Sequence, residues 1–168
     1  MKKKKKPRGH GKGSGFERKI AKEIIKAYRK AGFKVKQNDC WRSVLSGGHE
    51  MSAGDLRMSA QMEKLFPYAV ECKFYKKIKL ENFLLGNKKS KEIQWLVQTM
   101  EGSRKSNKLT GLLVMKANRM KILTMRWLSY AEWKGMDNFI QTRNGCWEVK
   151  TWKEFLKTVV LDAQVRFL

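Results

Sequence analysis

The sequence predicts a mixed α/β domain in which helices pack on a central sheet. Apolar side chains recur every three to four residues from Ser14 onward, which is typical of an amphipathic helix. Short apolar runs at 69–74 and 111–115 lie next to turn-forming residues, which indicates buried strands. Helical and strand-like segments alternate along the chain, and we therefore expect one domain of both element types.

Each expected element follows from a local pattern. The first helix should begin at Ser14 and end at Gly32, a natural stop, and residues 33–35 should form a strand with one solvated face. Residues 38–54 lack periodicity and predict a long loop, and loops of that length are often functional. The other expected elements are strands at 55–58, 68–75, 111–115, 122–125 and 147–149, and helices at about 91–100, 127–133 and 152–160.

The charge of the chain predicts a polyanionic partner. The 168 residues include 38 Lys and Arg against 15 Asp and Glu, a formal net charge of +23. Self-repulsion at this charge opposes compaction, and nucleic acid is the commonest partner that relieves it. An anionic membrane is the rival partner, but no apolar run approaches the roughly 20 residues that span a bilayer. We expect nucleic acid as the partner and no membrane.

The length fits one domain with a substantial core. Residues 1–15 are expected to form a basic arm that stays disordered until it meets phosphate, followed by a single domain over 16–168. Within that domain we expect a core over about 16–127 and a C-terminal extension over 128–168. The cations of the arm are Lys2, Lys3, Lys4, Lys5, Lys6, Arg8 and Lys12.

The cysteines and the N-terminus bear on the cellular compartment. Cys40, Cys72 and Cys146 are odd in number and lack metal-ligand spacing. This argues against a disulfide framework and favours a reducing, cytoplasmic compartment. The basic start is not followed by an apolar segment, so no secretory signal is expected.

The strand at 69–74 contains the residues most suited to catalysis. Side chains alternate along a strand, so Glu71 and Lys73 share one face. Asp55 begins a strand that we expect to pair with this one as a hairpin. Two carboxylates on adjacent strands suit Mg²⁺ or Mn²⁺, an ion that activates water and neutralises charge at phosphorus. Lys73 would orient that water or stabilise the charge. The alternative is a solvated Glu–Lys pair on an exposed strand face, with Gly54-Asp55 as a turn.

Glu17 has two interpretations. With Ser14 it matches a capping box, which needs no function. Glu17 also lies at the edge of the apolar stripe, where a carboxylate can face the sheet and add a metal or water contact. Both interpretations stay open at this stage.

Several short motifs occur in a fixed order along the chain. They are Gly15-Phe16-Glu17-Arg18, Gly32-Phe33-Lys34-Val35, Ser46-Gly47-Gly48, Gly54-Asp55-Leu56 and Val70-Glu71-Cys72-Lys73, followed by the segments 94–98 and 112–116. This order resembles the PD-(D/E)xK nuclease superfamily over about residues 13–127. The strongest resemblance is to Holliday junction resolvases of archaeal type and their phage-borne relatives.

The resemblance implies a restriction-endonuclease-like fold, with a mixed central sheet flanked by helices. It implies Asp55 and Glu71 as metal ligands, with the main-chain carbonyl of Cys72 as a further ligand. Lys73 would be the catalytic lysine, and Glu17 the glutamate of the first helix, in contact with the metal through water. A loop serine near the scissile phosphate would be Ser46 or Ser43.

The expected function is therefore cleavage of branched double-stranded DNA, above all four-way junctions, by a metal-activated water. Mg²⁺ is the expected cofactor, and Mn²⁺ should substitute for it. Cutting two opposed strands requires two sites, which favours a homodimer. The resemblance also fits a phage-encoded protein that acts in the host cytoplasm. Another nuclease of the superfamily (nicking, restriction or repair) and a non-catalytic nucleic-acid-binding module remain alternatives. Besides the arm, the expected DNA contacts are Arg18, Arg42 and Lys76.

Tryptophan is abundant in this chain, with six residues. Indoles either stack on bases exposed at a branch point or pack in a core or interface, and we favour packing. The residues concerned are Trp127, Trp133, Trp147 and Trp152. His49, in the expected loop, either contacts phosphate or is solvated, and we favour a solvated side chain.

Overall fold

The computed structural model of the chain describes residues 10–43, 54–86, 89–106, 110–134, 139–142 and 145–167. Its N-terminal elements are α1 (His10–Lys30), η1 (Gln37–Asp39), β1 (Cys40–Arg42), β2 (Leu56–Met58), α2 (Ala60–Leu65), β3 (Tyr68–Tyr75) and α3 (Glu81–Leu85). The remaining elements are α4 (Lys91–Ser106), β4 (Thr110–Ala117), β5 (Leu123–Leu128), α5 (Tyr130–Trp133), β6 (Ile140–Thr142), β7 (Gly145–Thr151) and α6 (Trp152–Phe167).

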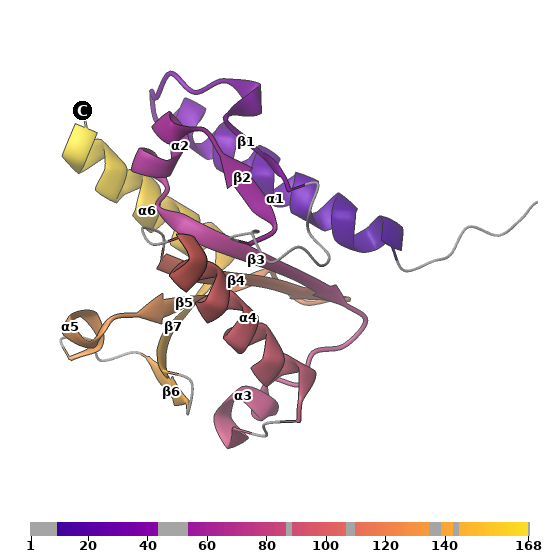
Figure 1. Ribbon diagram of the computed structural model, residues 1–168. Coiled ribbons are helices and arrows are strands. Elements are labelled where there is room, and N and C mark those ends of the chain that lie inside the picture. The colour runs from indigo at the N-terminus through magenta and orange to yellow at the C-terminus, as the bar shows by residue number, and fades with distance from the viewer. Residues whose placement is uncertain are drawn as a thin grey trace, which may run out of the picture.

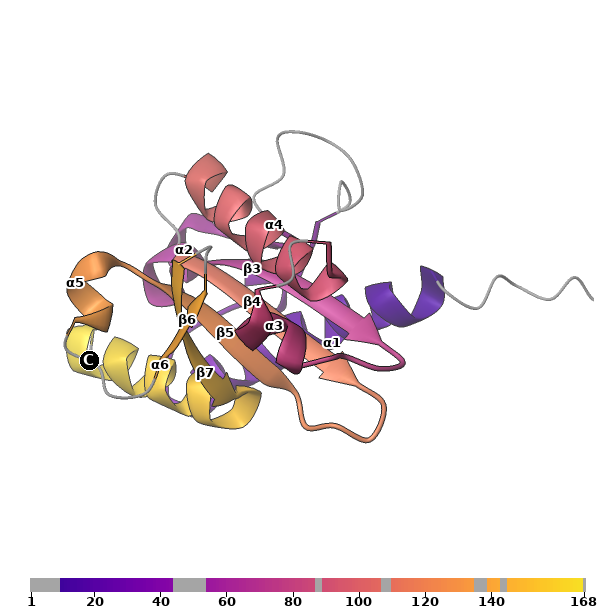
Figure 2. The ribbon, with the colours of Figure 1, turned by 90° about the horizontal axis from the view of Figure 1, so that it is seen from below.

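A five-stranded mixed sheet forms the centre of the molecule, with the strands in the order β3-β4-β5-β7-β6 (Figures 1 and 2). β3 and β4 are parallel, and the crossover between them carries α4, whereas the other neighbours are antiparallel. β3 is therefore an edge strand of this sheet. β1 and β2 pair with each other as a separate antiparallel ribbon. The Asp55 amide donates to the Val70 carbonyl at 2.7 Å, which joins the ribbon to the open edge of β3.

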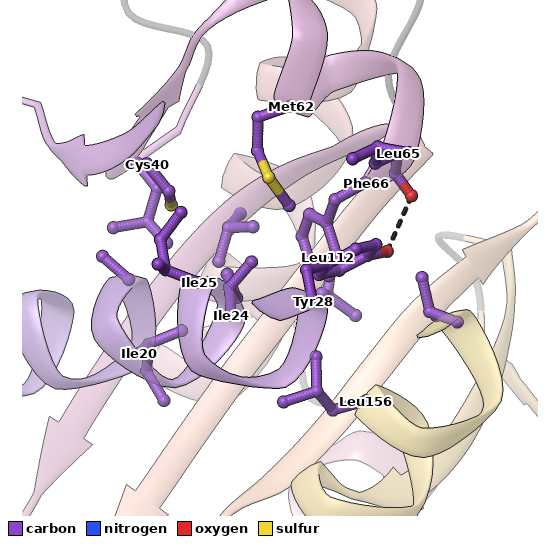
Figure 3. Packing of buried hydrophobic residues seen from close by; sticks show 14 of the residues in the cluster. Ile20, Ile24, Ile25, Tyr28, Cys40, Met62, Leu65, Phe66, Leu112 and Leu156 are labelled. Atoms are coloured by element: carbon purple, nitrogen blue, oxygen red, sulfur yellow. Dashed lines mark hydrogen bonds between the residues drawn. The ribbon is translucent and has the colours of Figure 1, made fainter. Parts of the chain in front are cut away.

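Helices cover both faces of the sheet, as Figures 1 and 2 show. Val70 and Leu112 point to the face that packs against α1 and α6. Leu113 and Trp147 point to the opposite face, covered by α4. On the first face the hydroxyl of Tyr28 in α1 donates to the Leu65 carbonyl at 2.7 Å (Figure 3). The expected mixed sheet flanked by helices is confirmed, and it is consistent with a PD-(D/E)xK nuclease fold.

Most expected elements are confirmed, and β3 has the expected bounds. The strand expected at 33–35 is wrong, because these residues form neither helix nor strand. Phe33 and Val35 are buried in the core beside α1, so their alternation reflects packing without a partner strand. The expected loop at 38–54 was wrong in its first part, which forms η1 and β1.

The region after β4 also differs from expectation. β5 continues to Leu128, where a helix was expected to begin already at Trp127. The helix α5 starts only after Ser129, whose side chain caps it by accepting from the Glu132 amide. Cross-strand pairing of Trp127 with Trp147 outweighs the helical pattern.

Candidate active site

Asp55 is held against the edge of β3 by two hydrogen bonds. Its amide donates to the Val70 carbonyl at 2.7 Å, and its Oδ2 accepts from the Cys72 amide at 2.8 Å. The preceding Gly54 makes this approach possible, because its φ is +87° and a Cβ would lie 2.5 Å from the Val70 carbonyl oxygen. The expected hairpin of β2 with β3 is wrong, since β2 pairs with β1 and α2 intervenes. Asp55 nevertheless lies next to β3.

Glu71 and Lys73 form an ion pair on β3, with 2.6 Å between Lys73 Nζ and Glu71 Oε1. Their side chains are only 14% and 18% exposed, so this is not the solvated pair of an exposed strand face. In the parallel register they lie opposite Leu113 and Met115, which belong to the α4 side of the sheet. The structure therefore confirms that Glu71 and Lys73 share a face.

The electrostatics of the site are dominated by two neighbouring carboxylates. Burial, and then the charge of Glu71, raise the pKa of Asp55 to about 7, although the hydrogen bond from the Cys72 amide lowers it. Burial by itself lowers the pKa of Lys73, but the charge and hydrogen bond of Glu71 outweigh it and the net shift is upward. The site thus keeps a protonated lysine beside acids that repel each other.

Glu17 lies close to this site and does not cap a helix. α1 begins at His10 rather than Ser14, so Ser14 is inside the helix and the capping-box interpretation is wrong. A glycine costs only about 1 kcal/mol in a helix relative to alanine, so the glycines before Phe16 weaken the first turns without ending the helix. Glu17 is 9% exposed and accepts a short hydrogen bond from the Arg42 guanidinium of β1. Its charge also raises the pKa of Asp55, which places it within electrostatic reach.

The donor set fits a hard divalent cation. Asp55 and Glu71 supply carboxylate oxygens, and the Cys72 amide points to the Asp55 edge. Because the N–H and C=O of one strand residue point to the same side, the Cys72 carbonyl points there too. No group of three or more His, Cys, Asp or Glu that could hold a metal occurs among the described residues. Mg²⁺ suits a site with two carboxylates because it retains several waters.

The other residues considered for the site fall into four groups. Ser46, His49 and the cations Lys2, Lys3, Lys4, Lys5, Lys6 and Arg8 lie outside the described residues, as does the side chain of Lys12. Ser43 is buried, and its amide donates to the Asp55 carbonyl at 2.8 Å. Arg18 and Lys76 are exposed. Trp147 and Trp152 are buried, which confirms packing for these two.

A basic stripe, of which only Arg18 was an expected DNA contact, runs along the exposed side of α1. Its exposed members are Arg18, Lys19, Lys22, Lys26, Arg29 and Lys30. The helical period of 3.6 identifies them as one face, opposite the apolar stripe. A row of cations on a helix is a typical contact for a phosphate backbone.

The comparison with protein families decides the class of the chain. The family model described as "Phage putative PDDEXK endonuclease" matches residues 8–164. The chain belongs to this family. The match confirms the expected superfamily and its relation to phage, and it extends past residue 127 to include most of the expected C-terminal extension. Neither a curated protein nor a solved structure matched the chain.

Nuclease activity follows from membership of this family of PDDEXK endonucleases, which generally use divalent metals. A nuclease binds DNA, in keeping with the net charge of +23. In the part of the chain that the structure describes, no helix has the length and apolar character to cross a membrane.

Proposed function

We propose that the protein is a Mg²⁺-dependent endodeoxyribonuclease with its active site at Asp55, Glu71 and Lys73. The observation that carries the proposal is the docking of Asp55 on β3 through the Cys72 amide, which brings it beside Glu71. Two acids and a lysine at one sheet edge form the set required to hold a hard cation and a phosphate.

Each residue has a separate role in this proposal. Asp55, Glu71 and the Cys72 carbonyl hold the ion, which when bound activates water and neutralises charge on the phosphate. Mn²⁺ should substitute for Mg²⁺, because both prefer oxygen ligands. Lys73, held by Glu71 at 2.6 Å, stabilises the charge that develops on the phosphate oxygens.

Glu17 and Arg42 have supporting roles. Their ion pair fixes α1 against β1, the strand that pairs with β2 next to Asp55. Glu17, whose charge raises the pKa of Asp55, would also contact the ion through water. Arg18 follows Glu17 in α1, and Arg42 of β1 bonds to Glu17. Both cations can therefore contact the DNA backbone near this part of α1.

The proposed substrate is branched double-stranded DNA, above all the four-way junction, cut by a homodimer in the host cytoplasm. The order of motifs from Glu17 to Lys73 supports this target, as does the excess of positive charge. A junction has two-fold symmetry, so two copies of the site related by the same axis would cut opposed strands. Contacts from a broad basic surface recognise the shape of the backbone more than its sequence.

A cleavage assay with matched substrates tests both levels of the proposal. The full chain is incubated with Mg²⁺ and either a four-way junction or linear duplexes of the same arm lengths. We expect paired nicks in opposed strands of the junction and little cutting of the duplexes. Equal cutting of both would contradict the junction target and leave a nuclease of another specificity. Absence of cutting on every substrate, with DNA binding retained, would leave a non-catalytic binding module.

A further inference from the structure

Trp41 is the one tryptophan among the described side chains that is largely exposed, at 44%. It lies in β1 between Cys40, which is 5% exposed, and Arg42, which bonds to Glu17 of α1. Alternation along the strand turns Cys40 and Arg42 toward the core and α1. The indole of Trp41 therefore points away from the core.

The outward face of the β1–β2 ribbon also contains Asp55. Trp41 pairs with Arg57 in the antiparallel register, and paired residues share a face. The ladder continues past β2, because the Ser43 amide donates to the Asp55 carbonyl. Leu56, between Asp55 and Arg57, is buried at 4%, so these two neighbours share the opposite face of the ribbon, on which the Asp55 carboxylate turns to the Cys72 amide of β3. Trp41 is then a diagonal neighbour of Asp55, at a typical distance of about 7–8 Å between Cα atoms.

Core packing does not account for this indole. Trp95, Trp147 and Trp152 are 4%, 0% and 5% exposed, so the fold buries tryptophan where it uses it for packing. Burying a large apolar side chain is worth about 1.5–3 kcal/mol, and Trp41, at 44% exposed, forgoes nearly half of that gain. Its neighbours on the same face are the cation Arg57 and the acid of the candidate site. An aromatic ring beside a cation suits a nucleobase joined to phosphate better than an apolar protein surface.

We propose that Trp41 stacks on an unpaired nucleobase beside the scissile phosphate, with Arg57 in contact with the adjoining phosphate. The proposal rests on the proposed function, which supplies DNA as the ligand. In an intact duplex both faces of each internal base are covered by its neighbours. An indole at this position can stack only where a base has lost a neighbour, as at a branch point, gap or flap. Trp41 would thus determine selectivity for interrupted duplexes.

The test measures stacking directly, with 2-aminopurine placed at the branch point of a four-way junction. Binding and fluorescence are measured for the full chain with Glu71→Gln, so that cleavage does not interfere, and in this background with Trp41→Ala or Trp41→Phe. Tyr130→Ala is the matched control, because Tyr130 is 70% exposed but lies in α5, which packs on β5. A thermal melt of each variant checks its fold.

We expect the protein to quench 2-aminopurine at the branch point and not within a duplex arm. Trp41→Ala should abolish the quenching and weaken junction binding about tenfold, as the loss of one base–aromatic stack predicts. Trp41→Phe should retain most of both effects, Tyr130→Ala should change neither, and binding to blunt duplex should be the same for all. Quenching and junction affinity unchanged in Trp41→Ala would overturn the proposal and assign the indole to a protein contact.

The result is independent of catalysis. If the chain without substitutions cuts no DNA while the Trp41-dependent quenching is observed, the proposed nuclease fails and the stacking role stands. If that chain cuts junctions, and Trp41→Ala introduced without Glu71→Gln cuts and binds them equally well, the nuclease stands and the stacking role fails.

Discussion

Two clusters of charged residues occupy the same sheet, and they differ in how their charges are balanced. The β5–β7 cluster comprises Arg126, Glu132, Glu148 and Lys150. Arg126 donates to Glu148 at 2.9 Å and to Glu132, and Lys150 lies 2.7 Å from Glu148. Burial by itself raises the pKa of Glu148, but the hydrogen bonds from Lys150 and Arg126 outweigh it and hold the pKa below its usual range. Two acids face two bases, and the cluster is neutral.

The candidate active site lacks this balance. Glu17 pairs with Arg42 and Glu71 pairs with Lys73, but no ion pair joins Asp55 to a cation among the described residues. The pKa of Asp55 is correspondingly raised to about 7, whereas that of Glu148 is lowered. A balanced cluster stabilises the fold, while one with an extra buried carboxylate fits an added cation. The difference separates a structural network from a candidate metal site on one sheet.

The largest expected effect separates the two clusters by activity. Glu71→Gln should lower the cleavage rate by roughly 10³-fold or more, because a metal ligand contributes several kcal/mol to the transition state. Glu148→Gln should lower the thermal midpoint and leave the rate of the folded protein unchanged. Single-turnover cleavage well below the midpoint of each variant measures this. Equal rate losses in the two variants would show that the clusters do not differ in role.

The next effect concerns stability. Arg126→Met should reduce the free energy of unfolding by about 1.5–3 kcal/mol at pH 7, because it removes one of the two cations that bond to Glu148, whose side chain is 8% exposed. Because folding lowers the pKa of Glu148, its contribution is present above the unfolded pKa of about 4.3 and is lost as the pH falls. The gap between the two proteins should therefore be constant near neutral pH and shrink only as the pH falls below about 4 in urea titrations.

Lys150→Met is the matched control for that measurement. The Lys150 side chain is 32% exposed, so its ion pair is more strongly screened and should be worth about 1 kcal/mol. A loss as large as that of Arg126→Met would assign the stability of the cluster to Lys150 instead.

The sequence predicted the strand of the site well but not the attachment of Asp55 to it. β3 is apolar and bounded by Pro67, so its extent and the shared face of Glu71 and Lys73 follow from local pattern. The position of Asp55 depends on the Cys72 amide and on Gly54, contacts between segments separated by α2. Local periodicity does not encode such contacts, which is why a hairpin was expected where the structure has a strand, a helix and a strand.

Glu17 and Trp41 show the same limit in different ways. Glu17 matched a capping box by sequence, but α1 begins at His10, so Glu17 lies inside the helix and pairs with Arg42 instead. Trp41 lay in a segment expected to be a loop, where successive side chains have no defined faces. Only the pairing of β1 with β2 shows that Trp41 and Cys40 point to opposite faces of a ribbon. The signal that could have drawn attention to Trp41 is its position directly before Arg42, an expected DNA contact, within the long loop expected at 38–54.

A smaller effect tests how Asp55 is held. Gly54→Ala should reduce the free energy of unfolding by roughly 2 kcal/mol, because a non-glycine residue is strained at a positive φ and its Cβ meets the Val70 carbonyl. Cleavage should fall with it, because Asp55 would move from the Cys72 amide. Gly15→Ala is the control: Gly15 lies in α1 with nothing within 4 Å of an added Cβ, and alanine there should stabilise by about 0.5–1 kcal/mol. Full activity in Gly54→Ala would contradict the role of this docking.

The smallest expected change in stability concerns Asp55, the extra carboxylate of the candidate active site. Asp55→Asn removes a buried charge that Glu71 repels, and an amide oxygen can still accept from the Cys72 amide at the position of Oδ2. The variant should therefore be inactive yet more stable than the parent by about 1 kcal/mol when no divalent ion is added.

Added Mg²⁺ should raise the thermal midpoint of the parent and not that of the variant, because ligands stabilise only the state that binds them. Glu148→Gln in the balanced cluster should do the opposite and destabilise. A variant of Asp55 less stable than the parent without metal would mean that its charge is already compensated, and the contrast between the two clusters would not hold.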